Sequence, residues 1–554
     1  MPIRRLLHSI GELLVYSNMC GYLGILMLLY LSGINADWHA DFGPWFVPTE
    51  GEPWPSVNMR SIQNGFLILR PSTFDIKLNQ DCDILTEAKT RYMSIITSES
   101  HYARLKFPRP EIRRSLRADL TFKGELEALD IRVAGACEVL PHLHMNESYR
   151  LTIIGKTADL FAPSVWGALR GLETFSQLLA FSGQGANLKI QTQTIFDTPK
   201  LPHRGLLLDT SRHFFPISDI LLTLDAMSYN KLNVFHWHII DDNSFPYQSK
   251  AFPELSEKGS WLPGLVYTAD DIKHVMEYAR LRGIRVMPEF DSPGHVRSWG
   301  ESHPEMLTTC YDTTGVPNGR LGPLDPSKEI IWPFLRTLFN EVMDLFQDKY
   351  IHLGGDEVPF DCWASNPNVR AFMTRKGMGA DFTRLESSYI AELLKIPAAK
   401  NKSSVVWQEV FDNNVDITSD TVVHVWTGLW SKELEKVTQA GHSALLSACW
   451  YLDHVAGGGD WKKYYRCDPL DFNGADVNRH LMLGGEACMW GEFVDSTNVH
   501  QRIWPRASAT AERLWSQGVD TIERAARRLE EHTCRMRRRR IPAQPPNGPS
   551  VCYA

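Results

Sequence analysis

The residues best suited to chemistry in this sequence are acidic side chains that follow short apolar runs. Asp356 and Glu357 form the central pair, because they follow Ile351-His-Leu-Gly-Gly355, an apolar run whose small residues allow close approach. Two carboxyl groups that lie close together push their pKa values apart, so one can stay protonated as a general acid while the other stays ionised. An isolated Asp-Glu pair is more often a solvated turn, so its meaning depends on the neighbouring segments.

Seven other apolar runs also end in polar or aromatic residues. Carboxylates can bind sugar hydroxyls and act as acid and base, and indole rings can cover the apolar faces of a sugar. The mixture therefore favours a carbohydrate site. In chain order these run ends carry Asp209, Arg212 and His213; His236, Asp241 and Asp242; Glu289, Asp291 and His295; then, after the run that ends in Asp356 and Glu357, Trp407 and Glu409; Trp426; Tyr451 and Asp453; and Glu486, Trp490 and Glu492.

Other kinds of site are disfavoured by the absence of their sequence signatures. The chain has no G-x-S-x-G elbow for a nucleophilic serine, no H-E-x-x-H helix for zinc and no G-x-G-x-x-G fingerprint for a nucleotide. The carboxylates and histidines could bind a divalent metal, but they alternate with tryptophans. We expect no metal and no organic cofactor.

The elements that must position these residues form a regular alternation of strands and helices. Helical spacing is clear over 217–229, 269–282 and 331–346. The pattern predicts a (β/α)₈ barrel, in which all strand ends face one mouth, with a doubly wound open sheet as the competing fold. The expected strands are 206–210, 232–240, 283–290, 349–354, 404–409, 422–427, 443–449 and 481–489.

A smaller α/β domain is expected before the barrel. Strand-like runs begin at Phe66, Phe74, Leu129 and Tyr149, and helical spacing occurs around 83–97 and 164–180. The predicted organisation is a targeting segment over 1–36, a linker over 37–60, the small domain over 61–197 and the barrel over 198–554.

Composition and the N-terminus indicate an exported protein. Of the 554 residues, 43% are hydrophobic and 22% charged, and the net charge of -7 argues against a nucleic-acid partner. Arg4 and Arg5 precede an uncharged stretch over 13–34, which favours a secretory signal peptide, with an uncleaved membrane anchor as the alternative. Asn146 and Asn401 begin glycosylation sequons, which matter only in an exported chain.

The ten cysteines also suit export and do not show C-x-x-C metal spacing. Spacing alone leaves the pairing open. Cys449 and Cys488 lie in apolar runs and are expected to be free thiols, and no partner is evident for Cys467. Three disulfides are plausible among Cys82, Cys137, Cys310, Cys362, Cys534 and Cys552.

Four motifs in one order make the chain similar to the β-N-acetylhexosaminidases of glycoside hydrolase family 20, closest to the animal lysosomal α and β chains. The resemblance covers the barrel and, more weakly, the preceding domain through Trp166-Gly-Ala-Leu-Arg-Gly-Leu-Glu-Thr-Phe. The four motifs are Asp209-Thr-Ser-Arg-His213, Pro288-Glu-Phe-Asp-Ser-Pro-Gly-His295, His352-Leu-Gly-Gly-Asp-Glu-Val358 and Gly484-Gly-Glu-Ala-Cys-Met-Trp-Gly-Glu492.

The resemblance implies a retaining exo-hydrolase that acts on terminal GlcNAc and GalNAc, with the substrate's 2-acetamido oxygen as nucleophile and an oxazolinium intermediate. By similarity, Glu357 is the general acid and base, Asp356 orients the acetamido N–H, and Tyr451 hydrogen-bonds its oxygen. Asp241 and His295 position Glu357. The remaining implied contacts to the sugar are Trp407, Trp426 and Trp490 around the acetyl group and ring, and Arg212, Asp453 and Glu492 on the hydroxyls.

Two segments depart from the family pattern. The family's α chains carry Asn-Arg where this chain has Asp453-His454, and its β chains carry Asp and an apolar residue, so neutral sugars are expected to be preferred. A histidine becomes cationic in acid, so His454 could favour anionic sugars there. The tyrosine that caps the neighbouring subunit's site in family dimers is missing near Gly457, although a homodimer or heterodimer is still expected.

Several alternatives stay open at the level of sequence. The glycan substrate could be glycoprotein, glycolipid or a chitin fragment, and the enzyme could be a narrow chitooligosaccharide or N-glycan-trimming type. A non-catalytic sugar-binding homologue and a structural role at a cell surface are further alternatives. The location could be lysosomal or secreted. The basic segment 535–540 is expected to be a solvated helix end.

Overall fold

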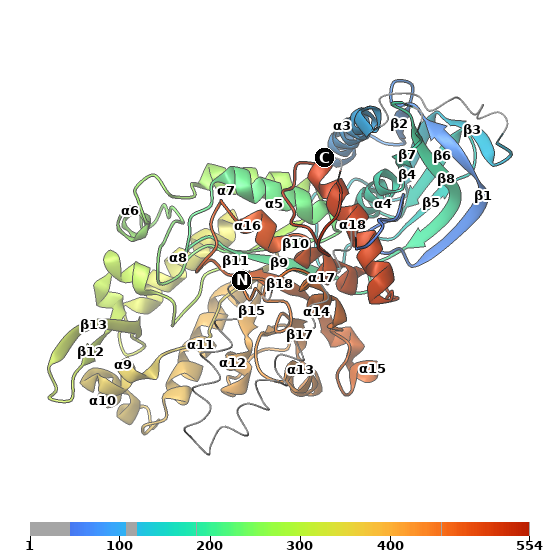
Figure 1. The fold of residues 1–554 in the computed structure, drawn as a ribbon. Coiled ribbons are helices and arrows are strands. Elements are labelled where there is room, and N and C mark those ends of the chain that lie inside the picture. Colours follow the sequence, from blue (N-terminus) through green and yellow to red (C-terminus); the bar gives the residue numbers. More distant parts are fainter. Residues whose placement is uncertain (1–44, 107–118, 184, 456, 553–554) are drawn as a thin grey trace, which may run out of the picture. The chain divides into compact units, whose positions relative to one another are not determined.

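The C-terminal part of the chain forms a closed parallel barrel of eight strands (Figure 1), which confirms the (β/α)₈ prediction over the open sheet. The computed structural model describes residues 45–106, 119–183, 185–455 and 457–552. Both faces of the barrel strands are buried, so their sequences are nearly continuous apolar runs. In order around the barrel the strands are β9 (His203–Asp209), β10 (Val234–His238), β11 (Arg285–Glu289), β14 (Tyr350–His352), β15 (Ser403–Trp407), β16 (Val422–Val425), β17 (Ser443–Leu446) and β18 (Met482–Met489).

Helices of unequal length connect these strands. A two-stranded hairpin, β12 (Leu307–Tyr311) and β13 (Pro317–Leu324), lies between β11 and β14. In the part of the chain that the structure describes, none of the helices is both long enough and apolar enough to span a membrane. The helices of this part are α5 (Ile217–Tyr229), α6 (Glu254–Gly259), α7 (Ala269–Arg280), α8 (Ile331–Leu345), α9 (Phe360–Ser365), α10 (Pro367–Arg375), α11 (Phe382–Ala399), α12 (Gln408–Asp412), α13 (Trp430–Gln439), α14 (Trp461–Arg466), α15 (Ala475–Asn478), α16 (Val499–Ile503), α17 (Arg506–Trp515) and α18 (Ile522–Arg538).

The preceding part is an eight-stranded mixed sheet with two helices, α3 (Asp83–Lys106) and α4 (Val165–Gln177). The sheet order is β2-β4-β6-β5-β8-β1-β3, with β7 paired to β8. Every residue of α4 is buried, which explains why this helix is almost free of charged residues. The strands are β1 (Met59–Leu69), β2 (Asp75–Leu78), β3 (Phe122–Leu126), β4 (Ala128–Val133), β5 (Tyr149–Ile153), β6 (Thr157–Ala162), β7 (Ala180–Phe181) and β8 (Leu188–Asp197).

A buried ion cluster joins the sheet to the barrel. Glu147, just before β5, accepts hydrogen bonds from Arg170 Nε at 2.8 Å and from Arg204 Nη2 at 2.6 Å. Arg170 also donates to the backbone oxygens of Arg282 and Gly283, at the start of β11. Burial alone would raise the pKa of Glu147, but the two guanidinium groups hold it below its ordinary value. The carboxylate is therefore the shared counter-ion of both halves.

The basic C-terminal segment is not a solvated helix end, which corrects the sequence expectation. Arg535 is 3% exposed and donates to Gln177 Oε1 at 3.0 Å. Arg539 donates to Glu173 Oε1 at 2.8 Å, so both arginines reach α4. The acidic partners come from a distant part of the chain, which the local charge pattern could not reveal.

Trp54, within the predicted linker, packs against helices and is fully buried. Its backbone N–H donates to Gln177 Oε1 of α4 at 2.6 Å, and its Nε1 donates to the backbone oxygen of Ser508 on α17 at 2.8 Å. The predicted targeting segment over 1–36 and Cys20 lie outside the described residues. Asn146 and Asn401 are both exposed.

Four disulfide bonds are present in the described residues, and one corrects the sequence expectation. Cys449 pairs with Cys467 rather than remaining a free thiol. The reason is that β17 ends at Leu446, so Cys449 lies on the following loop and not inside a strand. Cys488, inside β18, is free and buried as expected. The other bonds join Cys82 to Cys137, Cys310 to Cys362 and Cys534 to Cys552.

The shared counter-ion predicts a large loss of stability in Glu147→Ala. This change leaves the guanidinium groups of Arg170 and Arg204 buried without their carboxylate, and breaking a buried ion pair in this way costs about 3–5 kcal/mol. Urea unfolding followed by intrinsic fluorescence measures the change as a lower midpoint of the first transition.

The matched control is Glu127→Ala, which removes an exposed ion pair with Lys156 in the same sheet domain. This control should unfold at the wild-type midpoint, because solvent already screens the pair. An equal midpoint for Glu147→Ala and wild type would contradict the role assigned to Glu147.

Candidate active site

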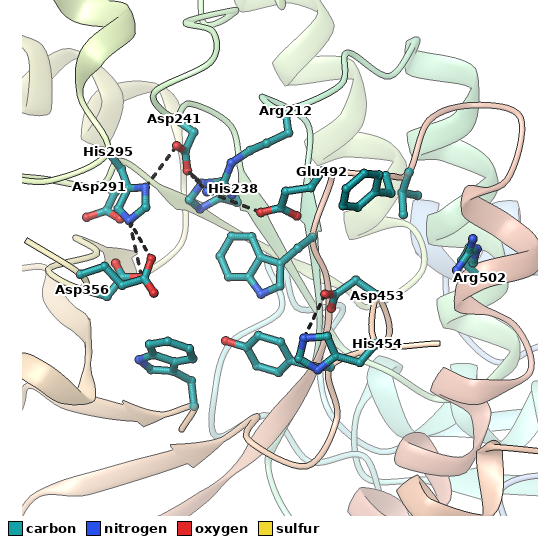
Figure 2. A pocket seen from close by; sticks show the side chains of 16 residues that line it. Arg212, His238, Asp241, Asp291, His295, Asp356, Asp453, His454, Glu492 and Arg502 are labelled. Atoms are coloured by element: carbon teal, nitrogen blue, oxygen red, sulfur yellow. Dashed lines mark hydrogen bonds and ion pairs between the residues drawn. The ribbon is translucent and has the colours of Figure 1, made fainter. Parts of the chain in front are cut away.

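A cavity of about 480 Å³ opens at the C-terminal ends of the barrel strands. This is the mouth at which the sequence analysis expected the polar strand ends to meet. Figure 2 shows the lining side chains converging on one space from several strands. Of the predicted catalytic and substrate-binding residues, all but Trp407 line it: Arg212, Asp241, His295, Asp356, Glu357, Trp426, Tyr451, Asp453, Trp490 and Glu492.

Two glycines after β14 let Asp356 and Glu357 enter this cavity. Gly354 has φ +68°, and a Cβ there would lie 1.8 Å from Asp291 Oδ1, so only glycine fits beneath that carboxyl group. Gly355 N donates to the same oxygen at 2.8 Å. Glu357 itself adopts φ 49°, a left-handed conformation that is uncommon outside glycine. The turn is therefore held in a strained shape that directs both carboxylates toward the cavity.

Asp291 is a site residue whose role the sequence analysis did not identify. It is buried, and burial together with the charge of Asp356 raises the pKa of Asp291 well above its usual range. The raised pKa favours the neutral form of Asp291 beside Asp356. Asp291 and Asp356 therefore form a further close pair of carboxyl groups at this site, with one carboxyl oxygen of each within 4.8 Å of the other and of a ring nitrogen of His295. The motif that ends β11 contained this signal, as a second acid two residues after Glu289.

His295 faces both carboxylates of the central pair. Its Nε2 lies 3.9 Å from Asp356 Oδ2 and 3.8 Å from Glu357 Oε2, and its Nδ1 lies 3.2 Å from Asp241 Oδ1. Figure 2 shows His295 between Asp241 and Asp356. Burial would lower the pKa of His295, but Asp356 and Asp241 offset this and raise it well above its ordinary value. These carboxylates therefore favour the cationic form of the imidazole beside the central pair.

Asp241 is itself held by a buried histidine that the sequence analysis did not assign. His238 Nε2 bonds Asp241 Oδ2 at 2.8 Å, and His238 Nδ1 bonds Glu289 Oε2 at 2.5 Å. Burial would lower the pKa of His238, but Glu289 and Asp241 raise it well above its ordinary value. Both ring nitrogens donate only when the imidazole is cationic. A buried line of alternating charges therefore runs from Glu289 through Asp241 to His295.

Arg212 belongs to the same charged wall. Its Nη1 donates to Asp209 Oδ2 at 3.0 Å, and its Nη2 lies 2.8 Å from Asp241 Oδ2 and 3.9 Å from Glu492 Oε1. Its guanidinium carbon lies 5.2 Å from the centre of the Trp490 ring. These contacts fix the guanidinium plane at the cavity wall, while Glu492 remains half exposed.

The opposite wall is aromatic, and two neighbouring side chains hold it in place. Trp426 Nε1 lies 3.0 and 2.9 Å from the two carboxylate oxygens of Glu409, and its backbone N–H donates to Gln408 Oε1 at 3.0 Å. The Trp426 ring stacks on Tyr451, with the ring centres 6.0 Å apart. Burial and the charge of Asp356 raise the pKa of Glu409 to about 7. Glu409 therefore links the aromatic wall to the charge of the central pair.

Trp407 lies beneath the cavity, not on its wall. It is 1% exposed, donates through Nε1 to Glu289 Oε1 at 2.8 Å, and lies 6.1 Å from Trp490 between ring centres. Trp407 therefore supports the predicted ligand site from below. Trp490 meets His238 edge to face at 4.9 Å, so the floor joins the aromatic side of the cavity to the charged side.

The rim carries the Asp453-His454 pair that the sequence analysis singled out. His454 Nε2 lies 3.5 Å from Asp453 Oδ2, and 71% of the His454 side chain is exposed. The His454 ring lies 5.6 Å from the Tyr451 ring. Three buried polar atoms at this cavity have no hydrogen-bond partner in the part of the chain that the structure describes. They are Asp356 Oδ1, His295 Nε2 and Asp453 Oδ1.

Comparison with known proteins agrees with this geometry. Residues 201–518 match the family model described as "Glycosyl hydrolase family 20, catalytic domain", and residues 53–178 match "beta-acetyl hexosaminidase like". The chain is 50% identical to the β-hexosaminidase subunit beta of Mus musculus over 84% of this chain and 85% of that one. It is 48% identical to the subunit alpha of Bos taurus, over 89% and 93%. Among solved structures, a chitobiase of Flavobacterium johnsoniae is 28% identical with a TM-score of 0.74, covering 88% of this chain and 73% of that one.

A buried acid behind the aromatic wall makes stability depend on pH. Glu386 on α11 is 1% exposed and accepts a hydrogen bond from Asn413 Nδ2 at 2.9 Å. Burial and the charge of Glu409 raise the pKa of Glu386 from 4.5 to about 8. Between these values the folded protein binds a proton that the unfolded chain releases. The stabilisation by this proton is complete below pH 4.5 and is lost as the pH rises toward 8.

We predict that Glu386→Gln reduces this loss, because the amide keeps an acceptor for Asn413 and cannot ionise. Removing this one titrating proton changes the slope of the free energy of unfolding against pH by at most about 1.4 kcal/mol per pH unit. Urea midpoints measured at intervals across this pH range test the expectation. Glu392→Gln, at an exposed position of the same helix, should keep the wild-type pH dependence. Parallel curves for Glu386→Gln and wild type would refute the assignment.

Proposed function

The chain belongs to glycosyl hydrolase family 20 and is a β-N-acetylhexosaminidase, and we propose that it releases terminal β-linked GlcNAc and GalNAc from the non-reducing ends of glycoconjugates. The observation that carries the proposal is the placement of Asp356 and Glu357. Their carboxylates lie 3.9 and 3.8 Å from the same atom, His295 Nε2, at a cavity whose other wall is aromatic. This arrangement supports one acid and one charge-stabilising group acting from the same side of a sugar.

The same arrangement supports substrate-assisted catalysis. A two-carboxylate retaining mechanism needs a nucleophile and an acid that flank the scissile bond. Asp356 and Glu357 are adjacent in the chain and both face one imidazole, so we place them on the same side of the sugar. We infer that the nucleophile is the oxygen of the substrate's own 2-acetamido group, which forms an oxazolinium ion. Glu357 protonates the leaving oxygen and later removes a proton from the water that opens this ion.

Asp356 stabilises the positive charge of the oxazolinium ion and orients its N–H. His295 supports this role, because its Nε2 lies 3.9 Å from Asp356 Oδ2, and Asp291, whose pKa is raised, lies beside the same carboxylate. Preorganised charge of this kind stabilises a transition state without solvent rearrangement. Asp241 and His238 act through His295, as positioning residues. Glu357 is 59% exposed, which suits a group that must exchange protons with both a leaving alcohol and water.

The aromatic wall accepts the acetamido group. Tyr451 donates to the acetamido oxygen, while Trp426 and Trp490 enclose the methyl group and the ring above Trp407. Glu409 acts through Trp426, because it fixes the indole N–H with both carboxylate oxygens. The wall therefore selects an N-acetyl substituent by shape and by one hydrogen bond.

The charged rim binds the hydroxyl groups of a single sugar. Arg212 follows β9, Asp453 follows β17 and Glu492 follows β18. Asp453 Oδ1, which has no partner in the described residues, supplies a buried acceptor. We infer exo cleavage of one terminal residue, with no metal and no cofactor in the reaction.

The relatives' names support further proposals on assembly and location. Because these relatives are named as subunits alpha and beta, we propose that this chain forms a homodimer or heterodimer. The missing tyrosine near Gly457 implies that any cap from a partner subunit uses other residues. The four disulfides support passage through an oxidising compartment, and we propose a lysosomal or secreted enzyme.

We predict that Glu357→Gln lowers kcat by about 10²–10⁴ on a disaccharide whose leaving sugar needs protonation, since this is the usual range of general acid catalysis. The loss should be smaller with a nitrophenyl leaving group, which departs without a proton. Asp356→Asn should reduce both reactions. Steady-state rates on the two substrates measure the difference, and wild-type turnover of the disaccharide by Glu357→Gln would overturn the assignment.

The identity of the nucleophile has its own test. Replacing the substrate's acetyl hydrogens by fluorine weakens the acetamido oxygen as a nucleophile, so kcat should fall with each added fluorine. A protein carboxylate as nucleophile would leave kcat nearly constant across the series. The first product, observed by NMR, should have the β configuration.

We also predict that His454→Leu lowers the relative rate on 6-sulfated GlcNAc glycosides in acid. A protonated imidazole at the exposed rim can pair with the sulfate, whereas leucine cannot. The readout is the ratio of kcat/KM for sulfated and neutral substrates across acidic pH. An unchanged ratio would remove His454 from the specificity of the site.

A further inference from the structure

One face of the N-terminal sheet carries a row in which three exposed apolar side chains flank Arg150, on the strands β6, β5, β8 and β1 that Figure 1 labels. The pairing registers place Phe161 of β6 opposite Arg150 of β5, Arg150 opposite Phe196 of β8, and Phe196 opposite Met59 of β1. Phe161, Phe196 and Met59 are 37%, 46% and 61% exposed. Single exposed apolar residues are ordinary, but several on one face of a sheet are characteristic of a surface that binds something.

This row lines a groove of about 500 Å³. Arg150 crosses the groove, with its guanidinium carbon 5.7 Å from the centre of the Phe161 ring. Its Nη2 lies 3.6 Å from Asp159. Its Nε is buried and has no hydrogen-bond partner in the described part of the chain. The groove therefore offers flat apolar rings beside an unsatisfied hydrogen-bond donor, which suits a ligand with both C–H faces and oxygen acceptors.

A glycosylation sequon stands at the rim of this groove. Ser148 lines the groove, and its Oγ donates to Asn146 Oδ1 at 2.6 Å. Ser148 N donates to the same oxygen at 3.0 Å. Asn146 is exposed, and these bonds occupy its carbonyl oxygen but leave its amide nitrogen available as the attachment atom. The amide that would bear a sugar is thus fixed beside the aromatic row.

We propose that Asn146 carries an N-linked glycan whose innermost GlcNAc residues fold back onto the groove over Phe161 and Phe196. The apolar C–H face of the first sugars covers the rings, and Arg150 donates to a sugar oxygen. The glycan thereby removes an apolar patch from water, and it belongs to the folded structure of the domain.

Two further observations favour this occupant over a second copy of the chain. Ser148, the third residue of the sequon, lines the groove, so a sugar attached to Asn146 reaches the groove at high effective concentration. The four disulfides indicate the oxidising compartment in which sequons are glycosylated. Asn401 provides a contrast, because its side-chain oxygen lies 3.3 Å from Lys349 Nζ on the barrel, far along the chain from this sheet.

The test is a double-mutant cycle on full-length protein from secreting animal cells. Mass spectrometry of glycopeptides first establishes the occupancy of Asn146. Asn146→Asp removes the glycan and keeps the oxygen that accepts from Ser148, and Phe196→Ser removes one groove ring. Thermal midpoints of wild type, both single variants and the double variant then give the coupling between sugar and ring.

We expect Asn146→Asp to lower the thermal midpoint by about 1–3 °C, which is the size of shift that losing the contact between a sugar and about one aromatic ring produces in a chain of this length. The variant should also bind more of an apolar dye. In the Phe196→Ser background the same change should have no effect. Val477→Ser, an exposed apolar residue of the barrel, and Asn401→Asp should show no coupling to it. Enzyme activity should be unchanged throughout, because none of these residues lines the active-site cavity.

Three results would overturn the proposal. One is an unmodified Asn146 in the secreted protein. Another is an equal effect of Asn146→Asp with and without Phe196. The third is a wild-type oligomer, measured by sedimentation, that dissociates on Phe196→Ser while the glycan has no influence, since this would assign the groove to a second copy.

Discussion

The active site depends on a carboxylate buried at the centre of the barrel, Glu289. It accepts hydrogen bonds from His238 and Trp407, and it has no exposed surface. A buried charge of this kind is costly unless neighbours compensate it, and here the imidazoles hold the pKa of Glu289 well below its usual range against the effect of burial. The interior of this barrel is therefore not a simple apolar core. It is an array of alternating charges that fixes the orientation of the cavity floor.

A chain of contacts between charged side chains connects that floor to the reacting groups. His238 orients Asp241, and Asp241 orients both Arg212 and His295. Each of these groups is the hydrogen-bonding or ionic partner of the one before it, so replacing any of them should disturb the whole chain of contacts. In the described part of the chain, buried polar atoms of Asp356, His295 and Asp453 lack partners where a substrate would lie. This division separates the permanent framework from the groups that are kept for the ligand.

Backbone strain also occurs at this site. Glu357 and His295 adopt φ values of 49° and 54°, and Gly354 leaves no room for a side chain beside Asp291. Such conformations persist only where the surroundings determine them strongly. The sheet domain contributes to that support from a distance, because Glu147 ties it to the barrel strands through two arginines. None of the described residues of the N-terminal domain lines the active-site cavity, but the domain stabilises the scaffold that holds the lining residues.

The sequence alone determined the barrel, its eight strands and nearly all of the residues at its mouth. Local patterns suffice for these, because a buried parallel strand is a continuous apolar run and the barrel brings every strand end to one side. Only the tertiary structure decided which carboxyl groups are paired. Burial and the charge of Asp356 raise the pKa of Asp291, and this pair forms because the turn at Gly354 packs against the Asp291 carboxyl group.

The same distinction explains the other differences. Arg535 resembled a solvated helix end because its partners on α4 lie far away in the sequence. Cys449 resembled a core thiol because a strand's end cannot be read to within a few residues. Trp407 resembled a wall residue, yet it lies below the cavity. Composition and periodicity report the burial and direction of a side chain along its own element. Composition and periodicity do not indicate which distant side chain a residue contacts, because that contact forms only when the elements pack.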